Sequence, residues 1–180
     1  MATHDDIFGV KQLMERHHVK NLNTAQRENG FVTTDMTGQQ LQDLSDSENG
    51  VAIAYDEKAK KVVGLLPGVS WGFLKPWPVF DYMAGILKNY PFNGEVLSAA
   101  TSYQYGPVCI DVAYRSQGIG ERLLDYQREV FSSRYKHTVS FVNVLNPRSY
   151  AFHRRNKLED PGFFEFNNNK YYMLAMNTTE

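Results

Sequence analysis

The sequence contains a single cysteine, Cys109. One cysteine excludes an internal disulfide and is typical of a protein from a reducing compartment. No apolar run approaches the roughly 18 residues that a membrane-spanning helix needs, and no positively charged segment followed by an apolar one opens the chain. We therefore expect a cytoplasmic protein that does not have a membrane as its partner.

Charge of one sign is not in excess either, because 19 lysines and arginines stand against 20 aspartates and glutamates. This balance gives no electrostatic reason to expect nucleic acid as a partner. The length of 180 residues and the 42% hydrophobic fraction suit one globular domain, residues 1–180. His17 and His18 would face different sides of a helix without a third ligand nearby, so we expect no metal site.

The most informative stretch runs from residue 105 to residue 128. It begins with the β-prone run Val108-Cys109-Ile110, continues through the glycine-bearing segment 115–120 and enters a helix. The expected buried face of that helix repeats every three to four residues, at Leu123, Leu124, Gln127, Val130 and Phe131. A strand, a glycine loop and a helix start expose backbone N–H groups that favour an anion, and glycine allows close approach. The pattern predicts an anion-binding loop.

Two common nucleotide-binding motifs fit this loop less well. The chain has no Gly-x-x-x-x-Gly-Lys-Ser/Thr sequence, which excludes a P-loop nucleotidase. A dinucleotide fingerprint needs a third glycine or alanine where Leu123 stands, and an acidic residue after the next strand, where the chain has Asn146.

At these residues the sequence resembles the GCN5-related N-acetyltransferase superfamily. Arg115-Ser116-Gln117-Gly118-Ile119-Gly120 matches that family's Arg/Gln-x-x-Gly-x-Gly/Ala motif. Downstream, Asn146-Pro147-Arg148-Ser149, Phe152-His153 and Gly162-Phe163 resemble its second cofactor segment and closing strand. The resemblance is specific from about residue 106 to residue 163.

The resemblance implies an α/β fold with a mixed, mostly antiparallel sheet of about six or seven strands flanked by helices. The cofactor-binding core would span residues 103–163, and acetyl-CoA would enter where the fourth and fifth strands part. Residues 20–36 would border the acceptor cleft. The family's first strand would be missing or reduced to a stub, because the expected first helix, residues 3–20, begins almost at once.

The resemblance also implies which residues bind the cofactor. The backbone of Cys109 and Ile110 would pair with the pantetheine arm, while Asn146 and Ser149 would contact the cofactor from the second segment. The loop amides would bind the pyrophosphate, and the first two residues of the loop would add a charge and a hydroxyl. This loop set is Arg115, Ser116, Gln117, Gly118, Ile119, Gly120 and Glu121.

For catalysis, His153 stands where many members of the family have a tyrosine that protonates the departing thiolate. A histidine with a pKa near neutrality suits that role, although the arginines beside it would lower its pKa. Tyr150 is the fallback acid. The base would be an ordered water first, then Asp111 or Tyr105. Cys109 is expected to be inert, because it lies in an apolar strand.

The rest of the chain gives local expectations. Thr37 and Gln40 form a capping box for a short helix. Two hairpins are expected, one from strands 51–55 and 62–66 with a sheet edge, a bulge or a strand break at Pro67, the other from strands 163–166 and 171–176. A buried strand is expected at residues 138–145. The aromatic insert at residues 69–102 would hold an extra helix near residues 80–90, with Tyr82, Ile86 and Leu87 inward.

The insert has two interpretations: a hydrophobic cluster that covers the sheet, or an acceptor-pocket wall or homodimer contact. For the whole chain, the resemblance implies an acetyl-CoA-dependent N-acetyltransferase, in which a primary amine of a small molecule or peptide attacks the thioester directly. The alternatives are an acyl-CoA-binding module without catalysis, a transferase for another acyl-CoA, and an interaction protein built on the aromatic insert.

Overall fold

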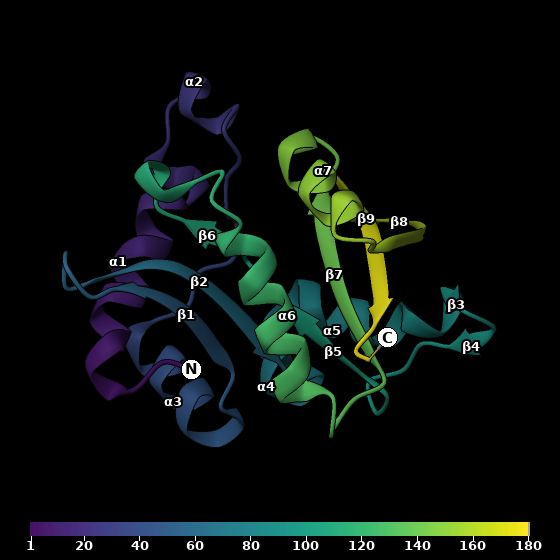
Figure 1. The fold of residues 1–180 in the computed structure, drawn as a ribbon. Coiled ribbons are helices and arrows are strands. Elements are labelled where there is room, and N and C mark those ends of the chain that lie inside the picture. The colour runs from purple at the N-terminus through teal and green to yellow at the C-terminus, as the bar shows by residue number, and fades with distance from the viewer. Residues whose placement is uncertain (180) are drawn as a thin grey trace. The chain divides into compact units, whose positions relative to one another are not determined.

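The structure is a computed structural model, and it describes residues 1–179. The chain divides into two compact units (Figure 1). The first consists of Met1–Gly68 and Gly106–Gln127, and the second of Val69–Tyr105 and the segment from Arg128 onward. Helix α6 (Ile119–Phe131) belongs to the first unit as far as Gln127.

The sheet of the first unit is built on an antiparallel hairpin, as the sequence predicted. Strands β1 (Val51–Asp56) and β2 (Lys61–Val69) pair across a turn, and β6 (Cys109–Ile110) pairs antiparallel with β2. The Asp56 carboxylate accepts the turn amides of Lys58 and Ala59 at 2.8 and 2.9 Å. Pro67 lies opposite Val51 within β2, so the expected break at this proline is wrong.

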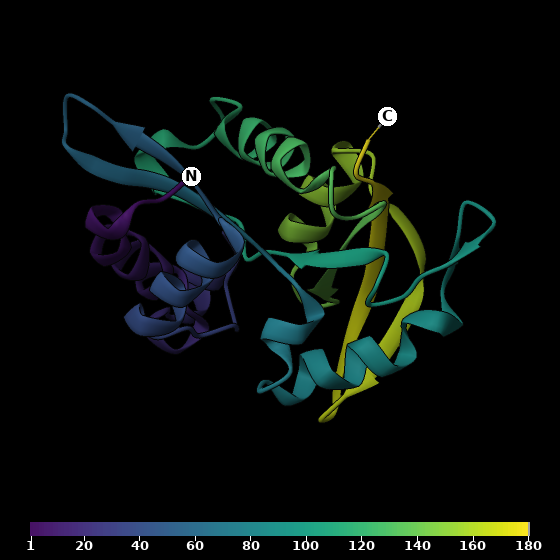
Figure 2. The ribbon, with the colours of Figure 1, turned by 90° about the horizontal axis from the view of Figure 1, so that it is seen from below.

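Helices cover both faces of this sheet. Helices α1 (Ile7–His17) and α3 (Gly38–Glu48) lie on one face, and α6 lies on the other (Figure 2). The predicted capping box is confirmed, because Thr37 Oγ1 accepts the Gln40 amide at 3.1 Å and Gln40 Oε1 accepts the Thr37 amide at 2.8 Å. The shorter helices of the unit are η1 (His4–Asp6), η2 (Val19–Asn21), α2 (Thr24–Arg27) and η4 (Val112–Tyr114).

The edge beside β1 carries only a stub. The Ala2 amide donates to the Val51 carbonyl at 2.7 Å. Within the described residues, no strand precedes α1. This agrees with the expectation of a reduced first strand.

The sheet of the second unit has the order β5-β7-β9-β8. Strand β5 (Ser102–Tyr105) is parallel to β7 (His137–Asn143), whereas β9 (Asn169–Asn177) is antiparallel to both β7 and β8 (Glu159–Phe166). Together with the three strands of the first unit, seven strands form mixed and mostly antiparallel pairs. The predicted hairpin at the end of the chain is confirmed, with Asn167 and Asn168 in the left-handed region that such a turn needs.

The aromatic segment covers one face of this sheet. It contains α4 (Trp71–Leu74), α5 (Pro78–Ile86) and η3 (Leu87–Asn89). The Phe80 ring meets Phe141 edge-on with centroids 5.4 Å apart, and the Trp71 indole donates to Ser102 Oγ at 3.1 Å. For these buried side chains the first interpretation of the insert holds. Helix α7 (Pro147–Arg155) covers the other face, where Tyr150 packs on Tyr172 with ring centroids 4.3 Å apart.

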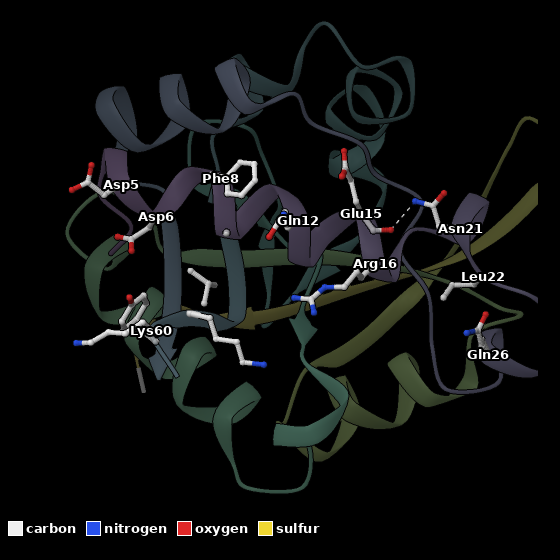
Figure 3. A pocket seen from close by; sticks show the side chains of 14 residues that line it. Asp5, Asp6, Phe8, Gln12, Glu15, Arg16, Asn21, Leu22, Gln26 and Lys60 are labelled. Carbon is white, nitrogen blue, oxygen red and sulfur yellow. Dashed lines mark hydrogen bonds between the residues drawn. The ribbon is translucent and has the colours of Figure 1, made fainter. Parts of the chain in front are cut away.

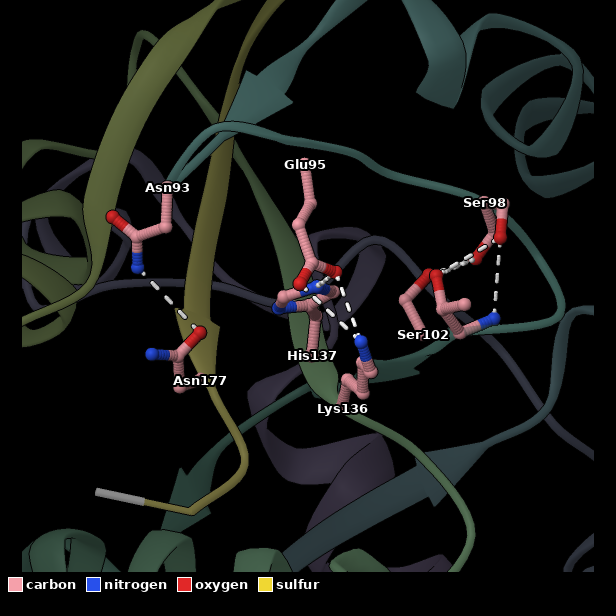
Figure 4. A network of polar contacts seen from close by, with 8 residues as sticks. Asn93, Glu95, Ser98, Ser102, Lys136, His137 and Asn177 are labelled. Atoms are coloured by element: carbon pink, nitrogen blue, oxygen red, sulfur yellow. Dashed lines mark hydrogen bonds and ion pairs between the residues drawn. The ribbon is translucent and has the colours of Figure 1, made fainter.

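A small hairpin of β3 (Pro91–Phe92) and β4 (Glu95–Val96) adds to the second unit. Its turn is Asn93-Gly94, with both residues at positive φ. Figure 4 shows how polar contacts attach it to the start of β7: Glu95 pairs with Lys136 at 3.2 Å and with His137 at 3.3 Å. Sequence reasoning missed this hairpin, although the Asn-Gly dipeptide was its signal.

Two expected burials are wrong. Leu145 is 76% exposed because β7 ends at Asn143. Tyr82 is 42% exposed, and the inward face of α5 carries Phe80 and Met83 instead.

Two glycine positions test the packing of these units. A Cβ at Gly68 would overlap the side-chain amide of the fully buried Gln127. Gly68→Ala should lower the free energy of unfolding by about 1–3 kcal/mol through overpacking. A Cβ at Gly85, inside α5, would meet nothing within 4 Å. Gly85→Ala should therefore be neutral or stabilising by up to about 1 kcal/mol. Urea unfolding of both variants measures this, and equal effects would contradict the packing described.

Candidate functional site

The glycine loop ends in a left-handed turn directly before α6. Ser116 has a φ of 62° and Gly118 a φ of 71°. The first helical bond joins the Arg122 amide to the Gly118 carbonyl at 3.1 Å. The amides of Ile119 and Gly120 therefore precede this first bond of the helix, and the positive end of the helix dipole adds to their field. A Cβ at Gly118 would meet nothing within 4 Å, so the space beside this residue is open.

Asp111 shapes the chain just before this loop. Its Oδ1 accepts the Ala113 amide at 3.1 Å, and its carbonyl accepts the Tyr114 amide at 2.8 Å. Tyr114 then donates its hydroxyl to Asp56 Oδ2 at 2.7 Å, which links the loop to the β1–β2 turn. These bonds fix the direction in which the chain enters the loop.

Asp111 is also held by two cations. Its Oδ2 lies 3.1 Å from the Lys61 ammonium and 3.6 Å from the Arg16 guanidinium. Burial by itself would raise its pKa, but the Ala113 amide and Lys61 outweigh this and lower the pKa below its ordinary value. A carboxylate stabilised in this way is a weak base.

Arg115 binds backbone carbonyls. Its Nε donates to the Ile110 carbonyl at 3.2 Å, and its Nη1 donates to the Asn29 carbonyl at 3.1 Å. The guanidinium thus joins the loop to the end of β6 and to the segment between α1 and α3.

Strand β6 carries the predicted pantetheine-binding residues Cys109 and Ile110. They pair with Leu65 and Gly64 of β2, which uses one edge of the short strand. Burial raises the pKa of the Cys109 thiol to about 12. The thiol is therefore protonated at neutral pH, which supports its expected inertness as a nucleophile.

The second cofactor segment lies in the second unit. Asn146 is the N-cap of α7 and accepts the Ser149 amide at 3.2 Å, and Pro147 occupies the first helical position. The predicted helix start is therefore confirmed. The cofactor roles of Asn146 and Ser149 stay predictions.

His153 and Tyr105 meet inside the second unit. Their ring centroids are 5.5 Å apart, and His153 Nδ1 lies 2.6 Å from the Ser149 carbonyl. Burial, partly offset by that carbonyl, lowers the pKa of His153 to about 4, so the imidazole is neutral at pH 7. The sequence correctly indicated a lowered pKa but assigned it to neighbouring arginines. Burial also raises the pKa of Tyr105 well above its ordinary value, so its phenol is protonated.

Tyr150, the fallback acid, is engaged elsewhere. Its hydroxyl donates to Asp160 Oδ2 at 3.0 Å. Its pKa is raised, first by burial and then by the Asp160 carboxylate.

The first unit has two hollows along α1. The larger is a groove of about 950 Å³ between α1 and the β1–β2 hairpin (Figure 3). Acidic side chains such as Asp5 and Asp6 line it from the helix side, and Lys60 and Lys61 line it from the hairpin. The smaller hollow is a pocket of about 370 Å³ beside the glycine loop. It is lined by Arg16, His17, Leu22, Gln26, Asn29, Gly30, Asp111, Val112 and Arg115.

His17 is the pocket residue that sequence reasoning missed. Its Nδ1 lies 2.9 Å from the Leu13 carbonyl, which can only accept, so Nδ1 carries a proton. Within the described residues its buried Nε2 has no hydrogen-bond partner. The sequence holds no signal for it beyond the two adjacent histidines.

Within residues 1–179, no group of three or more histidine, cysteine, aspartate or glutamate side chains is arranged to hold a metal ion. In the same part of the chain, no helix is long and apolar enough to cross a membrane.

Comparisons with known proteins identify the fold. No family model matches the chain, and a search of curated proteins found no match. Among solved structures, an N-acetyltransferase from Staphylococcus aureus Mu50 is similar at 12% identity and a TM-score of 0.62, covering 99% of this chain and 96% of that one. The chain has the GCN5-related N-acetyltransferase fold.

Two further structures support this. YncA from Salmonella typhimurium, described as an acetyltransferase and solved with its cofactor acetyl-CoA, has 10% identity and a TM-score of 0.64, with 99% of this chain and 92% of that one covered. A ribosomal-protein-alanine N-acetyltransferase from Brucella melitensis has 16% identity and a TM-score of 0.62, with 98% and 96% covered. The fold that the motif implied is therefore confirmed.

The predicted site residues fall into two groups within this N-acetyltransferase fold. The first unit brings together Cys109, Ile110, Asp111 and the loop of residues 115–121, as their spacing required. The second unit brings together Tyr105, Ser149 and His153 through the contacts described above, with Asn146 at the start of the same helix.

The buried His153 makes stability depend on pH. In the unfolded chain its pKa returns to the ordinary 6.5. As the pH falls from 6.5 towards 4, His153 becomes protonated in the unfolded state but stays neutral in the folded state. The free energy of unfolding therefore falls by about 3 kcal/mol in total. Denaturant unfolding of wild type and His153→Gln at several pH values tests this. The variant should not lose this part of the free energy of unfolding as the pH falls. Parallel curves of the free energy of unfolding against pH for the two proteins would contradict the prediction.

Proposed function

We propose that this protein is an acetyl-CoA-dependent N-acetyltransferase that transfers an acetyl group to a primary amine. The observation that carries the proposal is the left-handed turn at Ser116 and Gly118 directly before α6, with open space at the Gly118 Cβ position, within a fold shared with acetyltransferase structures.

The residues present fit the cofactor. A pyrophosphate is an anion, and amides at a helix start with open space beside Gly118 are suited to bind one. Gln117, Gly118, Ile119, Gly120 and Glu121 would supply these donors. The backbone of Cys109 and Ile110 offers peptide groups at the end of a short strand, where an extended chain of amides can add.

The chemistry of the bound cofactor is that of a thioester open to attack by an amine. The chain must then hold the amine in place, exclude competing water and manage protons. Asp111, Tyr105 and His153 remain the predicted proton-transfer residues. The ion pairs of Asp111 and the buried phenol of Tyr105 favour an ordered water as the first acceptor of the amine proton, with Asp111 as its partner.

The acceptor class stays open between small molecules and peptides. The name of the similar Brucella protein, a ribosomal-protein-alanine N-acetyltransferase, gives an alanine of a ribosomal protein as its acceptor. An N-terminal peptide amine is therefore a sensible first acceptor to assay. Peptide amines, polyamines and amino acids form the initial panel.

Thermal unfolding with acetyl-CoA tests the cofactor site. At about 100 times its dissociation constant, a ligand that binds only the folded state adds roughly 2.7 kcal/mol of stability. Gly118→Glu should abolish this shift, because its side chain and charge enter the open space beside this residue. Gly94→Glu is the matched control, since Gly94 also has a positive φ and no neighbour within 4 Å of its Cβ. A folded wild type that millimolar acetyl-CoA does not stabilise would contradict the proposal.

Thiol release in the presence of the amine panel then separates the alternatives. Stabilisation by acetyl-CoA without release for any amine would indicate a binding module, and stronger stabilisation by a longer acyl-CoA would indicate another donor. In the same assay, Asp111→Asn should lower kcat/KM more than Tyr105→Phe does. The reverse order would contradict the water–Asp111 assignment.

A further inference from the structure

The segment between α1 and α3 begins with a loop whose two ends are joined by backbone hydrogen bonds. It starts at His17 and ends at Val32, where the Val32 amide donates to the His17 carbonyl at 2.9 Å and the Val19 amide donates to the Val32 carbonyl at 2.8 Å. Residues 20–31 lie between these ends, and we call them the 20–31 loop. None of its residues is buried. The loop therefore cannot be held by a hydrophobic core of its own, and belongs to the easily opened parts of a fold.

Polar bonds give this loop its internal shape. Asn23 and Gln26 cap α2 reciprocally at 2.9 Å. The Arg27 guanidinium donates to the carbonyls of Val19 and Leu22, each at 3.1 Å. These bonds are local and shape the loop. The Asn21 side-chain amide, which donates to the Glu15 carbonyl at 2.8 Å, attaches the start of the loop to α1, but it does not hold the part that contains Asn29.

Arg115 provides a link from outside the loop. Its Nη1 donates to the Asn29 carbonyl, 86 residues away in the sequence, and its Nε donates to the Ile110 carbonyl. Arg115 lies three residues before Gly118 in the glycine loop. One planar guanidinium therefore joins the glycine loop, the end of β6 and the 20–31 loop.

The pocket of about 370 Å³ lies along this link. Asn29 and Gln26 line it from the 20–31 loop, and Arg115 and Val112 line it from the glycine loop side. His17, with its unpaired Nε2, lines the same pocket. The shape of the pocket consequently depends on how the two loops are held together.

We propose that Arg115 is a positioning residue whose guanidinium holds the 20–31 loop against the glycine loop and so couples the pocket to cofactor binding. A ligand that restrains the backbone of residues 116–120 also restrains Arg115, and through it Asn29. Cofactor binding would therefore increase the affinity of the pocket for its ligand. Linkage then requires that a ligand in the pocket increases the affinity for the cofactor by the same factor. The coupling rests on the proposed function, whereas the link itself does not.

Hydrogen exchange of the full chain without ligand tests the link. In Arg115→Gln the amides of Arg27, Asn29 and Gly30, which are bonded inside the loop, should exchange about fivefold faster, equivalent to the loss of about 1 kcal/mol. Arg115→Lys should be intermediate, because an ammonium lacks the planar fork that reaches two carbonyls. Arg122→Gln is the control, since this exposed arginine stands at the start of α6 away from the link. Equal exchange in wild type and Arg115→Gln would overturn the proposal.

The same exchange with saturating acetyl-CoA tests the coupling. In wild type the three loop amides should slow further, whereas in Arg115→Gln they should not slow, with acetyl-CoA raised in each protein until the unfolding temperature no longer increases. Loop amides that exchange faster with acetyl-CoA, or that slow equally in both proteins, would overturn the coupling. If acetyl-CoA fails to stabilise wild type, the proposed function and the coupling both fall, while the ligand-free comparison still decides the link.

Discussion

The left-handed turn at Ser116 and Gly118 is the local constraint on which the site depends. The chain leaves β6 at Ile110, passes through η4 and the left-handed turn, and starts α6 at Ile119. Asp111 begins this path by capping η4, and Tyr114 anchors it to Asp56. A glycine at position 118 reaches a positive φ without the steric cost of a side chain. Anion binding at this place thus follows from how the backbone turns.

Charged side chains around the turn connect the glycine loop to the neighbouring segments of the first unit. Lys61 and Arg16 neutralise Asp111, and Arg115 spans to carbonyls of β6 and the 20–31 loop. The backbone amides of residues 117–121 are the natural anion donors, and the side chain of Arg115 connects the loops. The burial of His153 and Tyr105 belongs to the second unit, where it favours neutral rings.

Local patterns in the sequence predicted much of this fold because the interactions behind them are local. The Thr37 capping box, the Asn146-Pro147 helix start and the glycine loop each lie within a few residues, and the structure contains all three helix starts. Leu145 and Tyr82 were misplaced because hydrophobicity does not show where a strand ends or how far a helix is covered. The bond from Arg115 to Asn29 joins segments 86 residues apart, and no single-sequence pattern marks such a contact.

Amide chemical shifts of the whole chain, titrated in parallel with coenzyme A and with pantetheine, test the central claim most directly. Pantetheine lacks the pyrophosphate but keeps the amide arm. If the start of α6 binds the pyrophosphate, the amides of Gln117, Gly118, Ile119 and Gly120 shift with coenzyme A and stay in place with pantetheine. Shifts of equal size with both ligands, or a loop that coenzyme A leaves unmoved while other amides shift, would contradict the account.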